Sequence, residues 1–465
     1  MAVLVIFTLL VVGYSIFFFA DRKKALLTLF LIKLPFDQVA WKYSIPVGLT
    51  QLRVSEAFTV FITLLLLATF LLDKTRDPNR KGFFRHIPSM ILIPMIIFMI
   101  VYFVYIFRGW WVGSLQLFFK LITGIVVGTY VAKTLKTEEE INWLLRCMLF
   151  STVIISILSM PAIYSGGELH VYAPSSENKF VGTQIGGGVG KYYAADSFAH
   201  AFIVNIPAIL FASAVLKSKW EKILCLSVSV FAILAVFAAA IRAGWISLSL
   251  ILIFWMIVRR QWKLILISVF CVFIVGTAQF FSNPLQRAYQ KIALEANSLE
   301  KGELPPEYAF GGRPLIWKTY IGYYMNASLL DKIIGNDNIL YMGLAKTTHD
   351  THNDFLTITL KMGIIGLSAT LFLYIWTSVC LLKANFSIRE PYSWNLALSA
   401  ILSLLSMMVP AFTRTGLMNP NYQWVFWTLA MITLKRYILS KSILPQSESS
   451  LSIDENSESI VSEIT

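Results

Sequence analysis

Two arginines stand out because each lies in a short polar break of an otherwise apolar sequence. Arg242 lies in AAAIRAGWIS, and Arg313 lies in GGRPLIWKTY. A guanidinium stays charged and can bind phosphate oxygens in pairs. A charged residue flanked so closely by apolar sequence is costly and is often functional. The two arginines therefore predict a site for an anion such as a phosphate group.

Simpler interpretations of both arginines stay open. Arg242 could extend to a membrane interface, and Arg313 could be a surface residue near a turn. The glycine pair 311–312 allows that turn, and Pro314 suits the first position of a helix. Arg313 would then lie at a helix N-terminus, which favours anions. Lys318, one turn further, could add to the anion site, although a solvated lysine is the more common case.

Two histidines follow in THDTHNDFLTITLKMGIIGL, directly before an apolar run. His349 and His352 are three residues apart, and a histidine can take a proton from a sugar hydroxyl near neutral pH. With Asp350 and Asp354 they could instead bind a divalent metal. No third histidine or cysteine lies close, so we expect no metal site. A histidine pair without chemistry is the third interpretation.

The elements that must position these residues are membrane helices. Of the 465 residues, 57% are hydrophobic and only 14% are charged, against about 45–50% and about 25% in soluble domains. The apolar residues form blocks of about 20, long enough to cross a bilayer, and without strict alternation they predict helices. We predict an all-α polytopic membrane protein with 12–13 transmembrane helices. The candidate spans are 2–20, 25–40, 54–72, 87–107, 114–133, 143–164, 196–216, 221–240, 243–258, 263–281, 355–382, 393–412 and 422–438.

Basic residues predict the orientation. The formal charge is +13, and the basic residues lie in short loops such as 73–85, on one side of the predicted alternation. The positive-inside rule makes this side cytoplasmic and explains the charge without a nucleic-acid partner. The other side receives 282–354, one large extracytoplasmic loop of nearly balanced charge. We predict a membrane domain over 1–445 and a disordered, acidic cytoplasmic tail over 446–465.

Four stretches, in this order, resemble the O-antigen ligase and polysaccharide polymerase superfamily of bacterial inner-membrane glycosyltransferases. They are KFVGTQIGGGVGKYYAADSFAH, AAAIRAGW, GGRPLIWKTY and THNDFLTITLKMGIIG. The last two together are fairly specific. The resemblance implies a membrane glycosyltransferase fold of the GT-C type. It also implies a metal-independent, inverting reaction without a cofactor, on the extracytoplasmic face of the bacterial inner membrane.

The resemblance also implies roles for individual residues. Arg242 and Arg313 would hold the diphosphate of a lipid-linked donor and stabilise the charge of the leaving group. His352 would be the general base or would orient the acceptor, and Asn353 would position it.

The sequence departs from the family pattern in three places. A Pro-Asn pair is usual where 194–196 reads Ala-Ala-Asp, and serine is common at the position of Ile241. His349 is an additional histidine that could share or take over the role of His352. We count His349 and Lys318 with Asn353 as candidate substrate-binding residues.

The resemblance implies transfer of a glycan from a polyprenyl diphosphate to an acceptor hydroxyl, in polymerisation of a surface polysaccharide such as O-antigen or exopolysaccharide. An O-antigen ligase or a protein O-oligosaccharyltransferase would use the same donor and differ in the acceptor. The partners would be the lipid-linked donor, an acceptor glycan or lipid, and the bilayer. A transporter or flippase of lipid-linked glycans is the alternative from another class. It predicts inverted repeats and charged or broken helices at the midplane, neither of which the sequence shows clearly.

Overall fold

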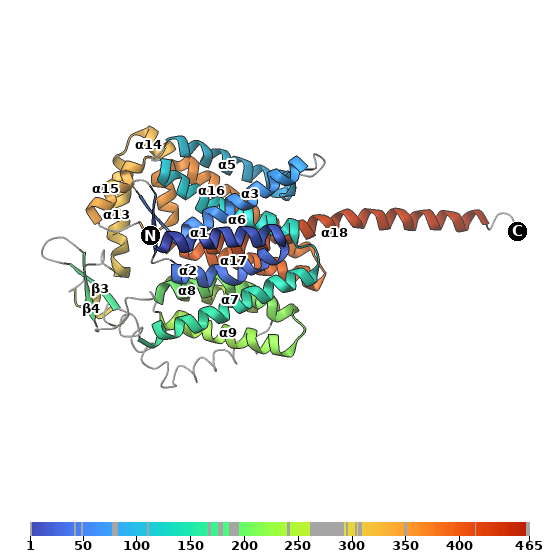
Figure 1. Ribbon diagram of the computed structural model, residues 1–465, viewed down its shortest axis with the longest axis horizontal. Coiled ribbons are helices and arrows are strands. Elements are labelled where there is room, and N and C mark those ends of the chain that lie inside the picture. The colour runs from blue at the N-terminus through green and yellow to red at the C-terminus, as the bar shows by residue number, and fades with distance from the viewer. Residues whose placement is uncertain are drawn as a thin grey trace.

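The computed structural model shows a bundle of long helices with shorter helices across one end (Figure 1). It describes residues 2–40, 43–47, 50–76, 82–108, 111–165, 169–174, 180–185, 195–239, 242–260, 293, 296–302, 305, 309–347, 351–413 and 415–461. The long helices are α1 (Ala2–Ala20), α2 (Arg22–Ala40), α3 (Val54–Arg76), α5 (Ser89–Arg108), α6 (Trp111–Thr134), α7 (Glu138–Ser165), α8 (Ala195–Val215), α9 (Lys219–Ala238), α10 (Arg242–Arg259), α16 (Asp354–Ser387), α17 (Pro391–Thr413) and α18 (Pro420–Val461). Four further helices, which we call the short helices although α13 has 18 residues, are α4 (Phe83–His86), α13 (Ala309–Asn326), α14 (Leu329–Ile334) and α15 (Asp337–Thr347).

The length and apolar character of the helices confirm the prediction of an all-α polytopic membrane protein. Among the described residues, nine helices are long and apolar enough to cross a membrane, and each corresponds to one of the predicted spans. Helices α1 and α2 cover the two N-terminal predictions, and α18 covers 422–438. The predicted span 263–281 lies outside the described residues. The total of 12 or 13 spans stays a prediction.

Two antiparallel hairpins interrupt the helices. Strand β1 (Ser44–Val47) pairs with β2 (Thr50–Arg53), and β3 (Leu169–Pro174) pairs with β4 (Phe180–Ile185). The second hairpin lies in the segment before α8 whose sequence resembles the family, and the sequence analysis predicts no strand there. Its Gly-rich continuation, 186–194, lies outside the described residues.

The centre of the bundle lies where α6 packs closely against α18. Gly124 and Gly128 face α18, and a Cβ atom at Gly124 would come within 2.5 Å of the carbonyl oxygen of Gln423. Small residues at this spacing let two membrane helices approach closely. The facing part of α18 is buried, including Trp424 and Trp427. Protein rather than lipid therefore surrounds this helix.

Helix α16 bends where a glycine allows it. Gly363 has a φ of 64° inside the helix, and Gly335, which ends α14, has a φ of 79°. The two glycines lie where α14 meets α16. A Cβ at Gly335 would overlap the backbone of Lys361, and one at Gly363 would overlap the backbone of Ile333. Only glycine combines the left-handed conformation with this close approach at low cost.

The predicted large loop 282–354 contains three of the short helices. Ile316 and Tyr320 of α13 pack with Ile339 of α15 and Leu360 of α16 in a small apolar cluster. This cluster holds α13 and α15 against the first turns of α16. The loop is therefore folded onto the bundle over the residues that the structure describes.

From α1 to α10, and again from α16 to α18, successive long helices alternate in direction (Figure 1), so the bundle has two distinct ends. At one end, α8 and α18 both begin, and the Nδ1 atom of His200 lies 2.8 Å from the hydroxyl of Tyr422. Helix α16 begins at this same end, where Asp354 accepts a hydrogen bond from the backbone N–H of Gly416. We call this end, which α13 and α15 cover in Figure 1, the site end.

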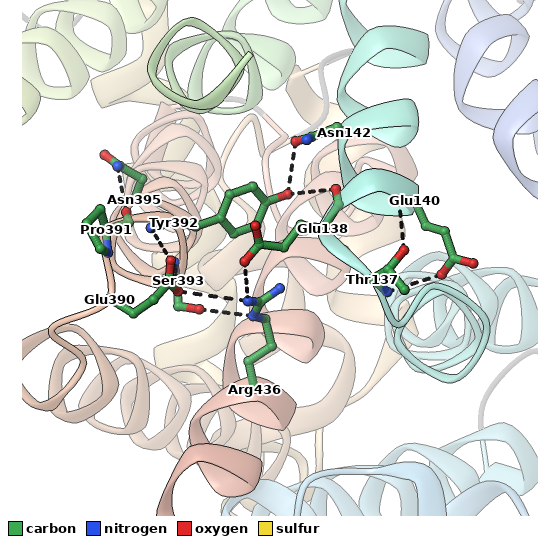
Figure 2. Close-up of polar contacts among 10 residues, drawn as sticks. All are labelled: Thr137, Glu138, Glu140, Asn142, Glu390, Pro391, Tyr392, Ser393, Asn395 and Arg436. Atoms are coloured by element: carbon green, nitrogen blue, oxygen red, sulfur yellow. Dashed lines mark hydrogen bonds and ion pairs between the residues drawn. The ribbon is translucent and has the colours of Figure 1, made fainter. Parts of the chain in front are cut away.

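At the opposite end, one arginine joins three helices (Figure 2). Arg436 of α18 donates from Nε to the hydroxyl of Ser393 (2.9 Å) and from Nη2 to the carboxylate of Glu138 (2.7 Å). The hydroxyl of Tyr392 lies within donating distance of two acceptors, the carbonyl of Glu138 (3.2 Å) and Oδ1 of Asn142 (3.0 Å). We call these residues the Arg436 clamp. The clamp fixes α18 against the first turns of α7 and α17.

Beyond this clamp, the backbone of α18 stays helical through Val461 and extends away from the bundle (Figure 1). The sequence analysis predicts disorder from residue 446, so helix is found where a disordered chain was expected. Propagating a helix that already exists avoids the cost of nucleation, which explains the difference. The division into a membrane domain and a tail stays a prediction.

Candidate active site

The candidate site is built around the N-terminus of α16. Asn353 is the N-cap, and its side-chain oxygen accepts a hydrogen bond from the backbone N–H of Leu356 (3.0 Å). His352, just before the cap, has a φ of 48° and is half-buried. A non-glycine residue in the left-handed region is uncommon and is often found where a site constrains the backbone. The cap and the turn before it thus fix the backbone at His352.

A buried hydroxyl group supports the same turn. Thr351 has no exposed surface, and its Oγ1 donates to the carbonyl of Asn353 (3.1 Å). The hydroxyl of Thr357, one turn into α16, donates to that carbonyl as well (3.0 Å) and contacts the hydroxyl of Thr351. The two threonines therefore hold the backbone on both sides of His352.

Helix α13 brings Arg313 toward this turn. The indole N–H of Trp317 donates to the carbonyl of Thr351 (2.8 Å), the residue next to His352. Arg313 lies four residues before Trp317, and residues at this spacing share one face of a helix. Arg313 is half-buried. The structure thus places Arg313 on the face of α13 that is bonded to the histidine turn.

The start of α13 differs from the prediction. The sequence predicts that Pro314 opens the helix, whereas α13 begins five residues earlier, at Ala309. Pro314 lies inside the helix, where it lacks the N–H that would bond the carbonyl of Phe310. Arg313 is therefore in the second turn and does not lie at the exposed N-terminus. Its anion-binding role rests on its own charge.

Asp354 joins the histidine turn to another part of the chain. Its side chain is almost fully buried, and Oδ2 accepts hydrogen bonds from the backbone N–H groups of Gly416 (2.7 Å) and Met418 (3.1 Å). These residues form the turn between α17 and α18. Arg414, which precedes this turn, lies outside the described residues. Asp354 thus fixes the turn between α17 and α18 beside the start of α16.

Arg242 begins α10 at the same end of the bundle. Helix α8 starts at the site end, α9 returns to it, and α10 starts there and packs against α8 and α17. The indole N–H of Trp245 donates to the carbonyl of Val236 (3.1 Å), and its ring stacks on Phe237 at 5.5 Å. Trp245, in the AAAIRAGW stretch, therefore packs the start of α10 against the end of α9. Arg242 is half-buried.

The structure does not bring every candidate into this arrangement. Lys318 is exposed on α13, and its position, five residues after Arg313, puts it on a different face of the helix. His349 lies outside the described residues. No cluster of His, Cys, Asp or Glu that could hold a metal occurs among the described residues. Because His349 and Asp350 are outside that part of the chain, the absence of a metal stays a prediction.

The sequence alone indicates no role for Trp317 or Thr351, and it suggests Asp354 only as a possible metal ligand. Trp317 and Thr351 occur inside or beside the quoted stretches GGRPLIWKTY and THNDFLTITLKMGIIG. Their partners lie 34 residues away for Trp317 and 62 residues away for Asp354. A single sequence does not reveal such pairs.

The arrangement can bind an anion and move a proton. Two guanidinium groups come from separate helices at one end of the bundle, and a histidine is held by a capped helix start between α13 and the α17–α18 turn. Cationic groups held in place before the reaction stabilise charge that develops on a leaving group. An imidazole held in a fixed orientation can accept a proton from a nearby hydroxyl.

Part of the chain is similar to a known protein family. The model of the O-antigen ligase family matches residues 227–371. The matched segment contains Arg242, Arg313 and His352, and it confirms the resemblance to the O-antigen ligase and polysaccharide polymerase superfamily. No curated protein matches the chain.

Proposed function

Because residues 227–371 match the O-antigen ligase family, we propose that this membrane protein transfers a glycan from a polyprenyl diphosphate to an acceptor hydroxyl. The observation that carries the proposal is that the matched segment supplies two arginines and a histidine to one end of the helix bundle. The substrates would be the lipid-linked donor and an acceptor glycan or lipid. The bilayer delivers the donor.

In the proposed reaction, the acceptor oxygen attacks the anomeric carbon of the donor glycan. The bond from this carbon to the diphosphate breaks, and polyprenyl diphosphate leaves with the bonding electron pair. His352 receives the proton of the acceptor hydroxyl. Arg242 and Arg313 stabilise the diphosphate charge. Displacement from the opposite face of the sugar would invert the configuration, and no metal takes part in this scheme.

The proposal places the site on the extracytoplasmic side of the bacterial inner membrane. Basic residues at the end opposite the site support this orientation by the positive-inside rule. They include Arg22, Lys133, Lys219, Arg259, Arg389 and Arg436. The site end would then face away from the cytoplasm, where lipid-linked glycans meet their acceptors.

Polymerase and ligase remain to be distinguished by the acceptor. We propose polymerisation of a surface polysaccharide as the main activity, while the description of the matched family favours a ligase. The two share the donor chemistry. Purified protein supplied with lipid-linked repeat units and a lipid or protein acceptor would separate them. Glycan chains that lengthen on the polyprenyl carrier support the polymerase, and label found only on the second acceptor supports the ligase.

The test of the site uses substitutions that leave the backbone unstrained. His352 has a positive φ, so alanine would add backbone strain to the loss of the ring, whereas asparagine tolerates this region. We expect His352→Asn to lower transfer by about 10²–10⁴-fold, the range for general acid–base catalysis. Arg313→Gln and Arg242→Gln should each lower it by about 10²–10³-fold.

The matched control is Arg389→Gln, since Arg389 is exposed and lies at the opposite end. This control should transfer at the wild-type rate. Near-normal transfer by all three site variants would refute the site. Movement of lipid-linked glycan across liposomes, without formation of a glycosidic bond by the wild type, would refute the reaction itself and favour a flippase.

A further inference from the structure

An apolar surface outside the membrane-spanning helices has no role in the proposed reaction. It lies on α14 and the C-terminal half of α13. The exposed large apolar side chains there are Ile321, Met325, Leu329, Leu330 and Ile333, with Leu329 at 73% and Leu330 at 61% exposure. Ile321 and Met325 are four residues apart in α13, and Leu329 and Leu330 precede Ile333 by four and three residues in α14, which places them along one side of each helix. We call these five residues the α14 patch.

The length of α16 indicates where the membrane edge lies. The helix has 34 residues, or about 51 Å at 1.5 Å per residue, whereas the hydrocarbon core is about 30 Å thick. Between Lys361 and Lys383, the 21 residues Met362–Leu382 carry no charge and would span about 32 Å. This stretch fits the hydrocarbon core. Its edge at the site end then falls beside Gly363.

Contacts between α14 and α16 place the α14 patch at that edge. Gly335, directly after α14, packs against the backbone of Lys361, and Gly363 packs against Ile333. The backbone N–H of Asn336 donates to the carbonyl of Leu360 (2.9 Å). The end of α14 is thus fixed at the level where the apolar stretch of α16 begins.

The α14 patch also continues a surface that faces lipid. Helices α5 and α16 pack together and have exposed apolar side chains near the site end. These are Phe103, Val104, Phe107, Ile364 and Ile365. The hydroxyl of Tyr105 donates to the carboxylate of Asp337 at the start of α15 (2.7 Å). This bond ties the end of α5 to the short helices that follow α14.

We propose that α14 and the C-terminal half of α13 lie in the membrane interface at the site end, with the α14 patch buried among lipid chains. A helix with one apolar side can lie in the plane of the interface. Tyr323 and Tyr324 of α13 are half-buried next to this region, and tyrosine is typical of the interface. The short helices would then anchor the catalytic segment to the leaflet that contains the donor lipid. This inference does not depend on the identity of the transfer reaction.

A photocrosslinking experiment tests this proposal on the full chain in nanodiscs of phosphatidylglycerol and phosphatidylethanolamine. A diazirine amino acid replaces Leu330, and mass spectrometry identifies the adducts after irradiation. We expect lipid adducts at Leu330, several-fold above those at Glu300. Glu300 is the matched control because it is exposed in the same segment of the chain.

If replacement of Leu330 yields no folded protein, the diazirine amino acid is placed at the neighbouring and more exposed Leu329. Equal, low lipid labelling at Leu330 and Glu300 would overturn the proposal, since it would mean that water covers the patch. Adducts to a second copy of the chain at Leu330, in place of lipid, would overturn it in favour of a dimer interface.

Discussion

Asn353 combines a contact present in the structure with a proposed contact to substrate, and the two can be separated. Its side-chain oxygen caps α16 through the N–H of Leu356 at 3.0 Å, which leaves the amide nitrogen to donate to an acceptor sugar. Asn353→Ala removes both groups. Asn353→Asp keeps a capping oxygen and removes the amide donor.

The structure sets the expected magnitudes. Loss of an N-cap costs about 1 kcal/mol, so Asn353→Ala should lower the free energy of unfolding by about that amount. Asn353→Asp should be at least as stable as the wild type, because a negative charge at a helix N-terminus contributes about 0.3–1 kcal/mol. A hydrogen bond contributes about 0.5–1.5 kcal/mol, so both variants should lose about two- to tenfold in transfer.

The assay pairs thermal unfolding of purified protein in detergent with the rate of transfer from a lipid-linked donor. An Asn353→Asp variant that is stable and fully active would refute the contact with the acceptor. Wild-type stability of Asn353→Ala would refute the capping argument. If Asn353→Ala loses transfer while Asn353→Asp keeps it, the loss of transfer comes from the loss of the helix cap and not from a lost contact of the amide with the acceptor.

Three further predictions concern the support of the site and the opposite end. Trp317→Phe removes the hydrogen bond to the carbonyl of Thr351, and the free energy of unfolding should fall by about 1 kcal/mol. The rate of transfer should fall more than the affinity for the donor, so kcat should decrease while KM changes little. Gly363→Ala should give little folded protein in size-exclusion chromatography, because its Cβ would overlap the backbone of Ile333 at a positive φ. Gly322→Ala is the matched control and should be tolerated, because a Cβ at Gly322 would have no atom within 4 Å. Burial acts to raise the pKa of Glu390, but hydrogen bonds from the first turn of α17 outweigh it and hold the pKa below 4.5. The carboxylate of Glu390 therefore stabilises the fold above about pH 4.5, and this contribution is lost as the pH falls through the lower folded-state pKa. In Glu390→Gln, the melting temperature should depend less on pH in this range. The same pH dependence as in the wild type would contradict a stabilising role of this carboxylate.

The membrane-spanning helices are the part of the fold that the sequence predicts best, because the lipid environment constrains them most. A chain in hydrocarbon must form long apolar helices, and all nine spans found among the described residues are predicted from hydropathy. Helix α18 is less apolar because protein surrounds it, and residues such as Gln423 and Thr428 are buried there. Its sequence nevertheless remains apolar enough to have been predicted as a span. The continuation to Val461 was not predicted, since composition alone indicates a polar tail.

The candidate site could be predicted as a set of residues, but its geometry could not. Charge in apolar sequence identifies Arg242, and the motif context identifies Arg313 and His352. Some of the hydrogen bonds that position the turn around His352 come from partners distant in sequence, such as Trp317 and Gly416. The left-handed conformation of His352 also follows from the tertiary structure, because histidine does not require it.

The Arg436 clamp has a consequence for biosynthesis. Helices α7 and α17 precede Arg436 in the chain, so the carboxylates of Glu138 and Glu390 are synthesised before the guanidinium that contacts both. A chain truncated before Arg436 would leave these two carboxylates without the guanidinium that contacts both. The closeness of Glu138 and Glu390 at this end of the bundle therefore depends on the docking of α18.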